Sequence, residues 1–186
     1  MDAFNYLAVL ISIILGLGIT QLLTGFGRWI EQRKEFRPFL PAMIWAGILL
    51  LIHVQTWWSM FGLRFVTHWT FLRFGVVLLQ PATLYLLAML VLPSSSVHSL
   101  DLRTNYFAQR RWFFGLLAFL LLVSVAKDLV LNGVLPSHVN LAFHGGFLAL
   151  AIAASVTERD RAHKVLAVLA GVTILSYVGL LFRDLQ

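Results

Sequence analysis

Three titratable side chains inside apolar stretches are the main candidates for chemistry in this sequence. His53, Asp128 and His144 each fall within a run of apolar residues, where an ionisable group is costly unless it has a partner or lines a hydrated cavity. Histidine titrates near neutral pH, and a nearby carboxylate is suited to pair with it. These residue types indicate proton transfer, ion binding or metal ligation.

No motif of a known enzyme class accompanies them. The chain lacks Gly-x-Ser-x-Gly, His-Glu-x-x-His and a phosphate-binding glycine loop, and it has no paired carboxylates. Cysteine is absent, which excludes thiolate metal sites, redox pairs and cysteine nucleophiles. We therefore expect a protein that is not an enzyme.

The three residues leave three hypotheses open, because their expected depths in a membrane agree within a turn or two. In the first, they and the nearby Gln55 and Asn140 form hydrogen bonds between helices and only stabilise packing. In the second, the cluster lines a hydrated vestibule for protons, ions or a small solute. In the third, His53 and His144 are the axial ligands of a b-type haem.

A proline inside an apolar run marks a further candidate site. Gln80 and Pro81 lie in the middle of the stretch 71–92, and a proline nitrogen has no hydrogen to donate to the carbonyl of Val77. We expect a kinked helix there, and kinked helices often border binding sites in transporters.

The composition identifies the setting in which these residues must work. Of the 186 residues, 60% are apolar and 12% are charged, and the mean hydropathy is +0.86. So few charges cannot cover the surface of a soluble domain of this size. The sequence therefore predicts an all-α integral membrane protein, and it excludes a soluble enzyme, a disordered chain and a disulfide-stapled module.

Six segments have the length and apolarity of membrane spans. The sequence predicts one domain, 1–186, that is a compact bundle of helices near 5–29, 40–62, 71–92, 112–132, 139–157 and 164–183. The first segment is interpreted as a transmembrane helix that is not cleaved off. A secretory signal begins with basic residues, and none precedes this segment. The polar stretch 93–111 is predicted to be a loop or a segment lying on the membrane surface.

The basic residues predict the orientation of the bundle. The net charge is +6, and ten of the fourteen Lys and Arg residues lie in alternate connections. These ten are Arg28, Arg33, Lys34, Arg37, Arg103, Arg110, Arg111, Arg159, Arg161 and Lys164. Arg64, Arg73, Lys127 and Arg183 remain for the opposite side. The positive-inside rule then places both termini outside, and the basic clusters are topology signals rather than a nucleic-acid surface.

Small residues recur at helical spacing in the first and fifth segments. Gly16 and Thr20 are four residues apart, Gly18 lies on an adjacent strip, and Gly146 is the centre of a small-residue face in the fifth segment. Small side chains let membrane helices approach closely. We expect these faces to pack within the bundle, with a subunit interface as the alternative.

Three short runs resemble segments of a family of small bacterial multi-pass membrane proteins with no assigned activity. The runs are Leu15-Gly16-Leu17-Gly18-Ile19-Thr20-Gln21-Leu22-Leu23, Asp101-Leu102-Arg103 and Arg110-Arg111-Trp112-Phe113-Phe114-Gly115. The resemblance implies a location in the bacterial cytoplasmic membrane, and it gives no residue a role.

These observations together favour a channel or carrier for an ion, a proton or a small solute. We expect it to sit in the lipid bilayer as a homo-oligomer or in a larger complex, with no cofactor and no nucleic acid. The alternatives are an accessory subunit that transports nothing, and an electron carrier with haem b.

Overall fold

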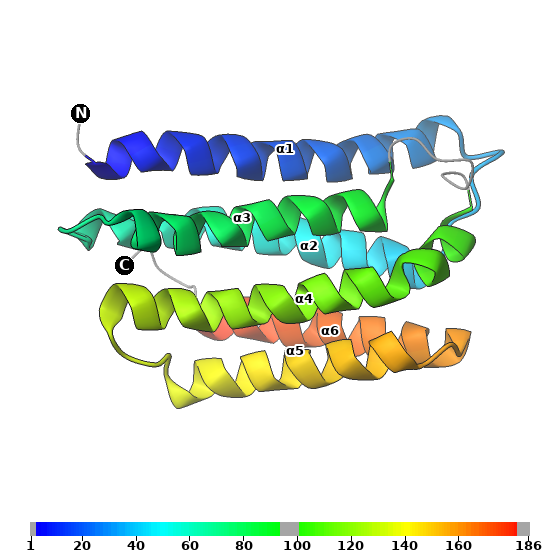
Figure 1. The fold of residues 1–186 in the computed structure, drawn as a ribbon. Coiled ribbons are helices and arrows are strands. Elements are labelled where there is room, and N and C mark those ends of the chain that lie inside the picture. The colour runs from blue at the N-terminus through cyan, green and yellow to red at the C-terminus, as the bar shows by residue number, and fades with distance from the viewer. Residues whose placement is uncertain (1–2, 94–100, 182–186) are drawn as a thin grey trace.

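The computed structural model describes residues 3–93 and 101–181, and the regular elements in this part of the chain are all helices (Figure 1). It contains six α-helices and one 3₁₀ helix, η1. Their bounds are α1 Ala3–Glu31, α2 Leu40–Ser59, η1 Met60–Phe65, α3 Phe71–Val91, α4 Leu102–Asn132, α5 His138–Val156 and α6 Asp160–Leu181. Arg183 and the ends of the chain lie outside the described residues.

All six α-helices are long and apolar enough to cross a membrane, as the sequence predicted. Even the shortest, α5 with 19 residues, is about 28 Å long at 1.5 Å per residue, close to the hydrocarbon thickness of a bilayer. The protein is therefore consistent with a multi-pass membrane protein whose mass lies almost wholly in its helices.

The largest difference from the predicted boundaries is the start of α4, which begins at Leu102 and not near 112. The side chain of Asp101 caps the helix by accepting hydrogen bonds from the backbone nitrogens of Arg103 and Thr104 at 3.1 and 3.3 Å. The Thr104 hydroxyl also donates to Asp101 at 2.9 Å, and this bond is the main reason that the Asp101 pKa lies below its usual value. The first turns of α4 are polar, but their side chains and backbone have hydrogen-bond or ion-pair partners. Hydropathy alone therefore does not reveal these turns.

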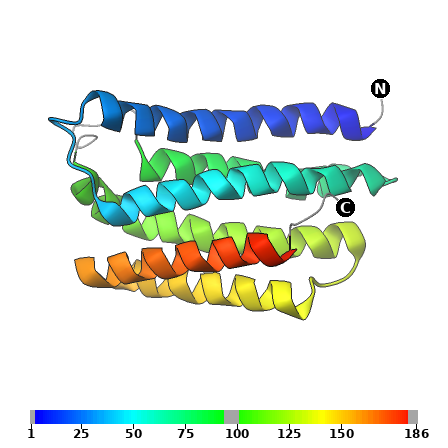
Figure 2. The same cartoon turned by 180° about the vertical axis from the view of Figure 1, so that it is seen from behind.

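Five of the helices form a ring, and the sixth lies outside it. Around the ring α2 contacts α3, α3 contacts α4, α4 contacts α5, α5 contacts α6, and α6 returns to α2. Helix α1 packs on the outer side of α3 and α2, as the views from both sides show (Figures 1 and 2). The interior of the ring is therefore enclosed by α2, α3, α4, α5 and α6, and α1 lies outside it.

Helix α1 attaches to the ring through one seam. The seam consists of buried residues at alternating spacings of four and three: Ile11, Leu15, Gly18, Leu22 and Gly25. A Cβ atom at Gly25 would stand 2.7 Å from Leu92, so glycine is required for the close approach. Gln21 of α1 also donates a 2.7 Å hydrogen bond to the carbonyl of Leu92, which satisfies an acceptor beyond the end of α3.

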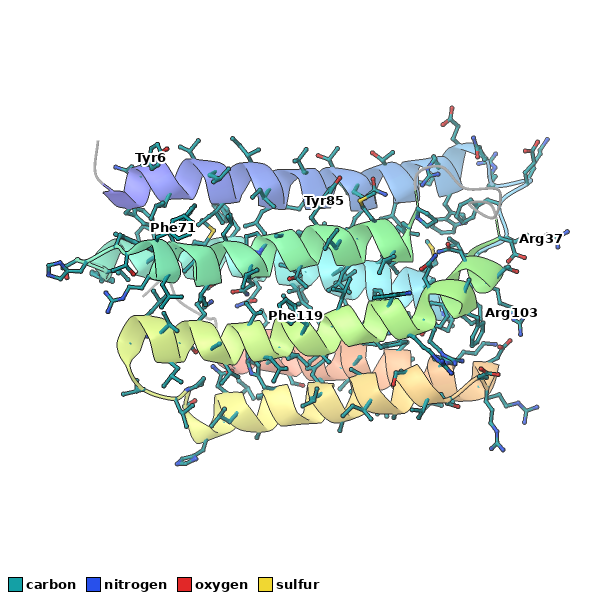
Figure 3. All side chains as sticks on the ribbon, viewed as in Figure 1. Tyr6, Arg37, Phe71, Tyr85, Arg103 and Phe119 are labelled. Carbon is teal, nitrogen blue, oxygen red and sulfur yellow. The ribbon has the colours of Figure 1, made fainter. Side chains whose placement is uncertain are left out.

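The ring interior is filled near the end of the bundle that carries Arg37 and Arg103, here called the basic end (Figure 3). Trp45 of α2 packs edge-on against Phe113 and Phe114 of α4, with centroid distances of 5.6 and 5.4 Å. Tyr106 and the imidazole of His163 complete this aromatic cluster, at a centroid distance of 5.1 Å. The opposite end of the ring is hollow, and the candidate site lies there.

Candidate functional site: a polar cavity inside the helix ring

A cavity of about 280 Å³, here called the polar cavity, lies inside the ring at the end opposite the basic end. All five ring helices contribute to its wall, together with η1 and Val66. Its polar lining residues are Gln55, Ser59, Gln80, Ser124, Lys127, Asp128, Asn132, Asn140 and Tyr177. A dense set of polar groups between apolar helices is expensive unless water or a solute fills the space.

A second, smaller space continues the polar cavity toward the middle of the bundle. This inner chamber has a volume of about 60 Å³. It shares four lining residues with the polar cavity: Gln55, Gln80, Ser124 and Tyr177. Its remaining lining is mostly apolar, including Leu117, Phe147 and Ile174, and the aromatic cluster fills the ring beyond it. The hollow is therefore lined by polar groups at one end and by apolar groups toward the centre.

Lys127 is the most distinctive residue of the polar cavity. Its ammonium group donates a 2.9 Å hydrogen bond to Oε1 of Gln80, and Nε2 of Gln80 lies 3.4 Å from the hydroxyl of Thr56. Because lysine can only donate, the amide oxygen of Gln80 must face it, which leaves the amide nitrogen to donate to Thr56. This chain links α4, α3 and α2, and Gln80 and Thr56 are both buried.

The charge of Lys127 is only partly satisfied by that contact. Gln80 is neutral, and within residues 3–93 and 101–181 no carboxylate lies within 4.0 Å of the ammonium nitrogen. An ammonium group has three N–H donors, and the hydrogen bond to Gln80 uses one. The next residue, Asp128, lines the same cavity. The polar cavity therefore offers one positive and one negative group to whatever fills it.

On the α5 side, His144 lines the inner chamber and is hydrogen-bonded to residues that line the polar cavity. Its Nδ1 lies 2.9 Å from the carbonyl of Asn140, and its Nε2 lies 3.1 Å from the hydroxyl of Ser124. Because a carbonyl only accepts, the neutral imidazole carries its hydrogen on Nδ1, and Nε2 accepts from Ser124. The Tyr177 hydroxyl donates to Asn140 Oδ1 at 3.3 Å. Helices α4, α5 and α6 thus contribute a hydrogen-bonded wall.

The structure brings together four of the five residues predicted to form a polar cluster, and it separates the fifth. Gln55, Asp128 and Asn140 line the polar cavity, and His144 lines the inner chamber. His53 instead points at α1: it is fully buried, and a Cβ atom at Gly18 would stand 2.2 Å from its Nε2. Its Nδ1 donates to the carbonyl of Leu49 at 2.7 Å.

This geometry does not fit a haem between the two histidines. An axial ligand needs a free ring nitrogen and a flat open space beside it. The Nε2 of His53 abuts the backbone of α1 at Gly18, and both nitrogens of His144 are engaged by Asn140 and Ser124. The two imidazoles also face different sides of the ring wall, so they do not converge on one site.

Helix α3 continues through Pro81 from Phe71 to Val91. Beside Gln80 and Pro81 lies a void of about 20 Å³ that also borders Val77 and Lys127. Because Pro81 has no N–H, the Val77 carbonyl loses its usual helical donor, and a void of this size has room for one water molecule. The proline therefore provides a polar niche next to Lys127.

The small-residue faces differ from the packing predicted for them. Gly18 does pack closely, against His53, whereas Gly16 and Gly146 have no atom within 4 Å of an added Cβ, and Thr20 is exposed. On α5 the whole face is exposed: Ala142, Gly146, Ala149 and Ala153. The prediction of packing within the bundle is therefore wrong for this face, because α5 turns its larger residue Phe147 toward the ring instead.

Sequence reasoning missed Lys127, since its charge was counted only as an orientation signal near the end of a span. It also missed a buried clamp at the basic end. Arg110 donates to the Thr157 carbonyl at 2.8 Å and to Glu158 at 3.0 Å, and His163 bonds the same carbonyl at 3.0 Å and the Tyr106 hydroxyl at 2.8 Å. For Lys127, the available sequence signal was its position five residues inside the apolar segment 112–132. No sequence signal pointed to the clamp at the basic end.

Comparison of the chain with protein-family models, with curated proteins and with solved structures found no match. The assignment of a function therefore depends on the geometry of the site.

Proposed function

We propose that the protein is a membrane carrier that binds a small polar solute in the polar cavity. The observation that supports this proposal is the pairing of a partly satisfied ammonium group with a carboxylate in one hollow of about 280 Å³. Lys127 would hold a negatively charged group of the solute, and Asp128 a positive or hydrogen-bond-donating group. A small zwitterion such as an amino acid has both.

A carrier fits these features better than an open pore. The inner chamber ends on Leu117, Phe147 and Ile174, and the aromatic cluster fills the ring between it and the basic end. An ion would have to cross closely packed, mainly apolar side chains there, where an uncompensated charge costs several kcal/mol. Solute bound at Lys127 would cross only if the ring helices moved, as in alternating access.

The proposal places the protein in a bacterial cytoplasmic membrane with its basic end inside and both termini outside. The distribution of Lys and Arg supports this orientation, because Arg37 and Arg103 lie at the same end of the bundle (Figure 3). The polar cavity then opens toward the outer side, where it would receive solute.

Uptake by proteoliposomes tests the proposal. Purified protein reconstituted in liposomes is offered radiolabelled amino acids, small carboxylates and inorganic phosphate. We expect uptake of at least one zwitterion, lost in the variant Lys127→Met and preserved in Lys34→Met, which removes an exposed lysine of the α1–α2 connection. Equal elution profiles on size exclusion establish that the variants are folded. If nothing in the panel is taken up, or Lys127→Met equals the wild type, the carrier proposal fails.

One observation favours a second candidate function, that of an accessory subunit. The exposed small-residue face of α5 leaves room for another helix to approach closely. On this reading Gly146→Leu abolishes association with a second copy or another subunit, while the melting temperature of the monomer is unchanged. Cross-linking in membranes before and after the substitution measures the association, and an unchanged cross-linking pattern contradicts this candidate.

A further inference from the structure

A groove lies on the outer surface of the bundle between α4 and α5, near the basic end. These helices run side by side (Figure 1), and the groove between them has a volume of about 470 Å³. It lies outside the ring and is separate from the polar cavity. Its lining includes Arg111, Gly115 and Ala118 of α4, and Ala151, Ile152 and Val156 of α5.

Small side chains create the groove, and apolar side chains border it. Gly115 has no atom within 4 Å of an added Cβ, so its part of the groove floor is open. Ile152 and Val156 on the rim are 55% and 75% exposed. The surface of the groove is thus suited to hydrocarbon along most of its length.

Arg111 supplies a positive charge at one end of this apolar groove. The other two arginines in the first turns of α4 have internal partners: Arg103 pairs with Asp160 at 2.9 Å, and Arg110 with Glu158 at 3.0 Å. Arg111 is exposed and has neither a hydrogen bond nor an ion pair in the described part of the chain. Its guanidinium is therefore available to a ligand. Its neighbour Trp112 is 72% exposed, as expected for a ring at headgroup level.

The dimensions of the groove match part of one lipid leaflet. Arg111 and Ala118 are seven residues apart on α4, which corresponds to about 10 Å along the helix. The hydrocarbon of one leaflet is about 15 Å thick. A lipid whose phosphate contacts Arg111 would lay most of one acyl chain along Gly115 and Ala118.

We propose that this groove is a binding site for one anionic phospholipid. Its acyl chain occupies the groove floor at Gly115, and its phosphate pairs with Arg111 in the bidentate manner that guanidinium groups favour. Charge complementarity selects an anionic lipid, since the basic end also carries Arg159 and Lys164. The site is independent of the proposed carrier function.

Native mass spectrometry of delipidated protein tests the site. The full chain in detergent is titrated with phosphatidylglycerol or with phosphatidylcholine of identical acyl chains. We expect one tightly bound phosphatidylglycerol, with Arg111→Gln weakening its affinity about fivefold, as for one basic residue at a membrane surface. Gly115→Leu fills the groove floor and should prevent the tight binding. The control Arg161→Gln removes an exposed arginine at the same end but outside the groove, and should change the affinity less than twofold.

Any of the following three results would overturn the proposal. Equal affinity for the two lipids, or an unchanged affinity in Arg111→Gln, removes the role of the arginine. Glycerol 3-phosphate that binds as tightly as the lipid removes the role of the acyl chain. A dimer that Gly115→Leu dissociates assigns the groove to a second copy of the chain. Arg111→Gln changes only an exposed side chain, so it tests the proposal even if Gly115→Leu fails to fold.

Discussion

At the scale of single residues, the side of the helix decides what a buried polar group does. His53 and Gln55 are two positions apart on α2, which is about 200° around the helix axis. His53 therefore contacts α1, whereas Gln55 lines the polar cavity. The sequence predicts the depth of both residues from the length of the span. It cannot give the direction of either, because α2 is apolar all round and has no polar face to orient it.

Gly18→Ala tests the contact between α1 and α2. The new methyl group would stand 2.2 Å from Nε2 of His53, which is fully buried and held by Leu49. We expect a loss of about 2 kcal/mol of stability from overpacking. Thermal unfolding in detergent measures it.

The control for this prediction is Gly16→Ala on the same helix, which meets no atom within 4 Å. Replacing a helical glycine by alanine there should be neutral or stabilise by about 0.5–1 kcal/mol. The double variant Gly18→Ala with His53→Ala should recover part of the lost stability, because the methyl group then has room. Equal melting temperatures for the two alanine variants would show that α1 and α2 do not meet at Gly18.

At the scale of elements, apolar runs predicted all six helices, and polar residues concealed two of their ends. Helix α4 extends about ten residues beyond its apolar part because Asp101 caps it and Arg103 pairs with Asp160. Helix α6 begins at Asp160, the partner of Arg103 in that ion pair. These contacts join residues far apart in the sequence, so no local pattern reveals them. Lys127 was overlooked in the same way, since its partner Gln80 lies on another helix.

Asp101 should make the first turns of α4 sensitive to acid. Its pKa in the folded protein is lowered, so the folded state binds its proton less readily than the unfolded state does. The stabilisation is therefore present above the ordinary aspartate pKa, near 3.9, and is lost as the pH falls through the lowered folded value. The protection of the Arg103 and Thr104 amides from hydrogen exchange, measured relative to the intrinsic exchange rate at each pH, should fall over that interval.

Two substitutions isolate this cap. Asp101→Asn keeps a good capping group and should make the protection of these amides independent of pH, whereas Asp101→Ala should cost about 1 kcal/mol at neutral pH. If the protection of these two amides in the wild type follows the same pH curve as in Asp101→Asn, the role of the carboxylate is contradicted.

At the scale of the whole molecule, the ring gives the protein two unlike ends. The basic end is filled by aromatic side chains and closed by the Arg110 and His163 clamp on the α5–α6 connection. The other end holds the polar cavity, with Lys127 and Asp128 in its wall. We propose that water and solute enter this cavity from the side of the membrane opposite the basic end.

Labelling of single cysteines tests that claim most directly, because the natural chain has no cysteine to interfere. Ser124 lines both the polar cavity and the inner chamber, and its neighbour Val123 is buried, lines neither space and serves as the matched control. In sealed cells or right-side-out vesicles, a small membrane-impermeant thiol reagent added outside should modify Ser124→Cys and leave Val123→Cys unmodified. Modification of Ser124→Cys only from the cytoplasmic side would reverse the orientation, and equal resistance of both cysteines from either side would contradict a hydrated cavity.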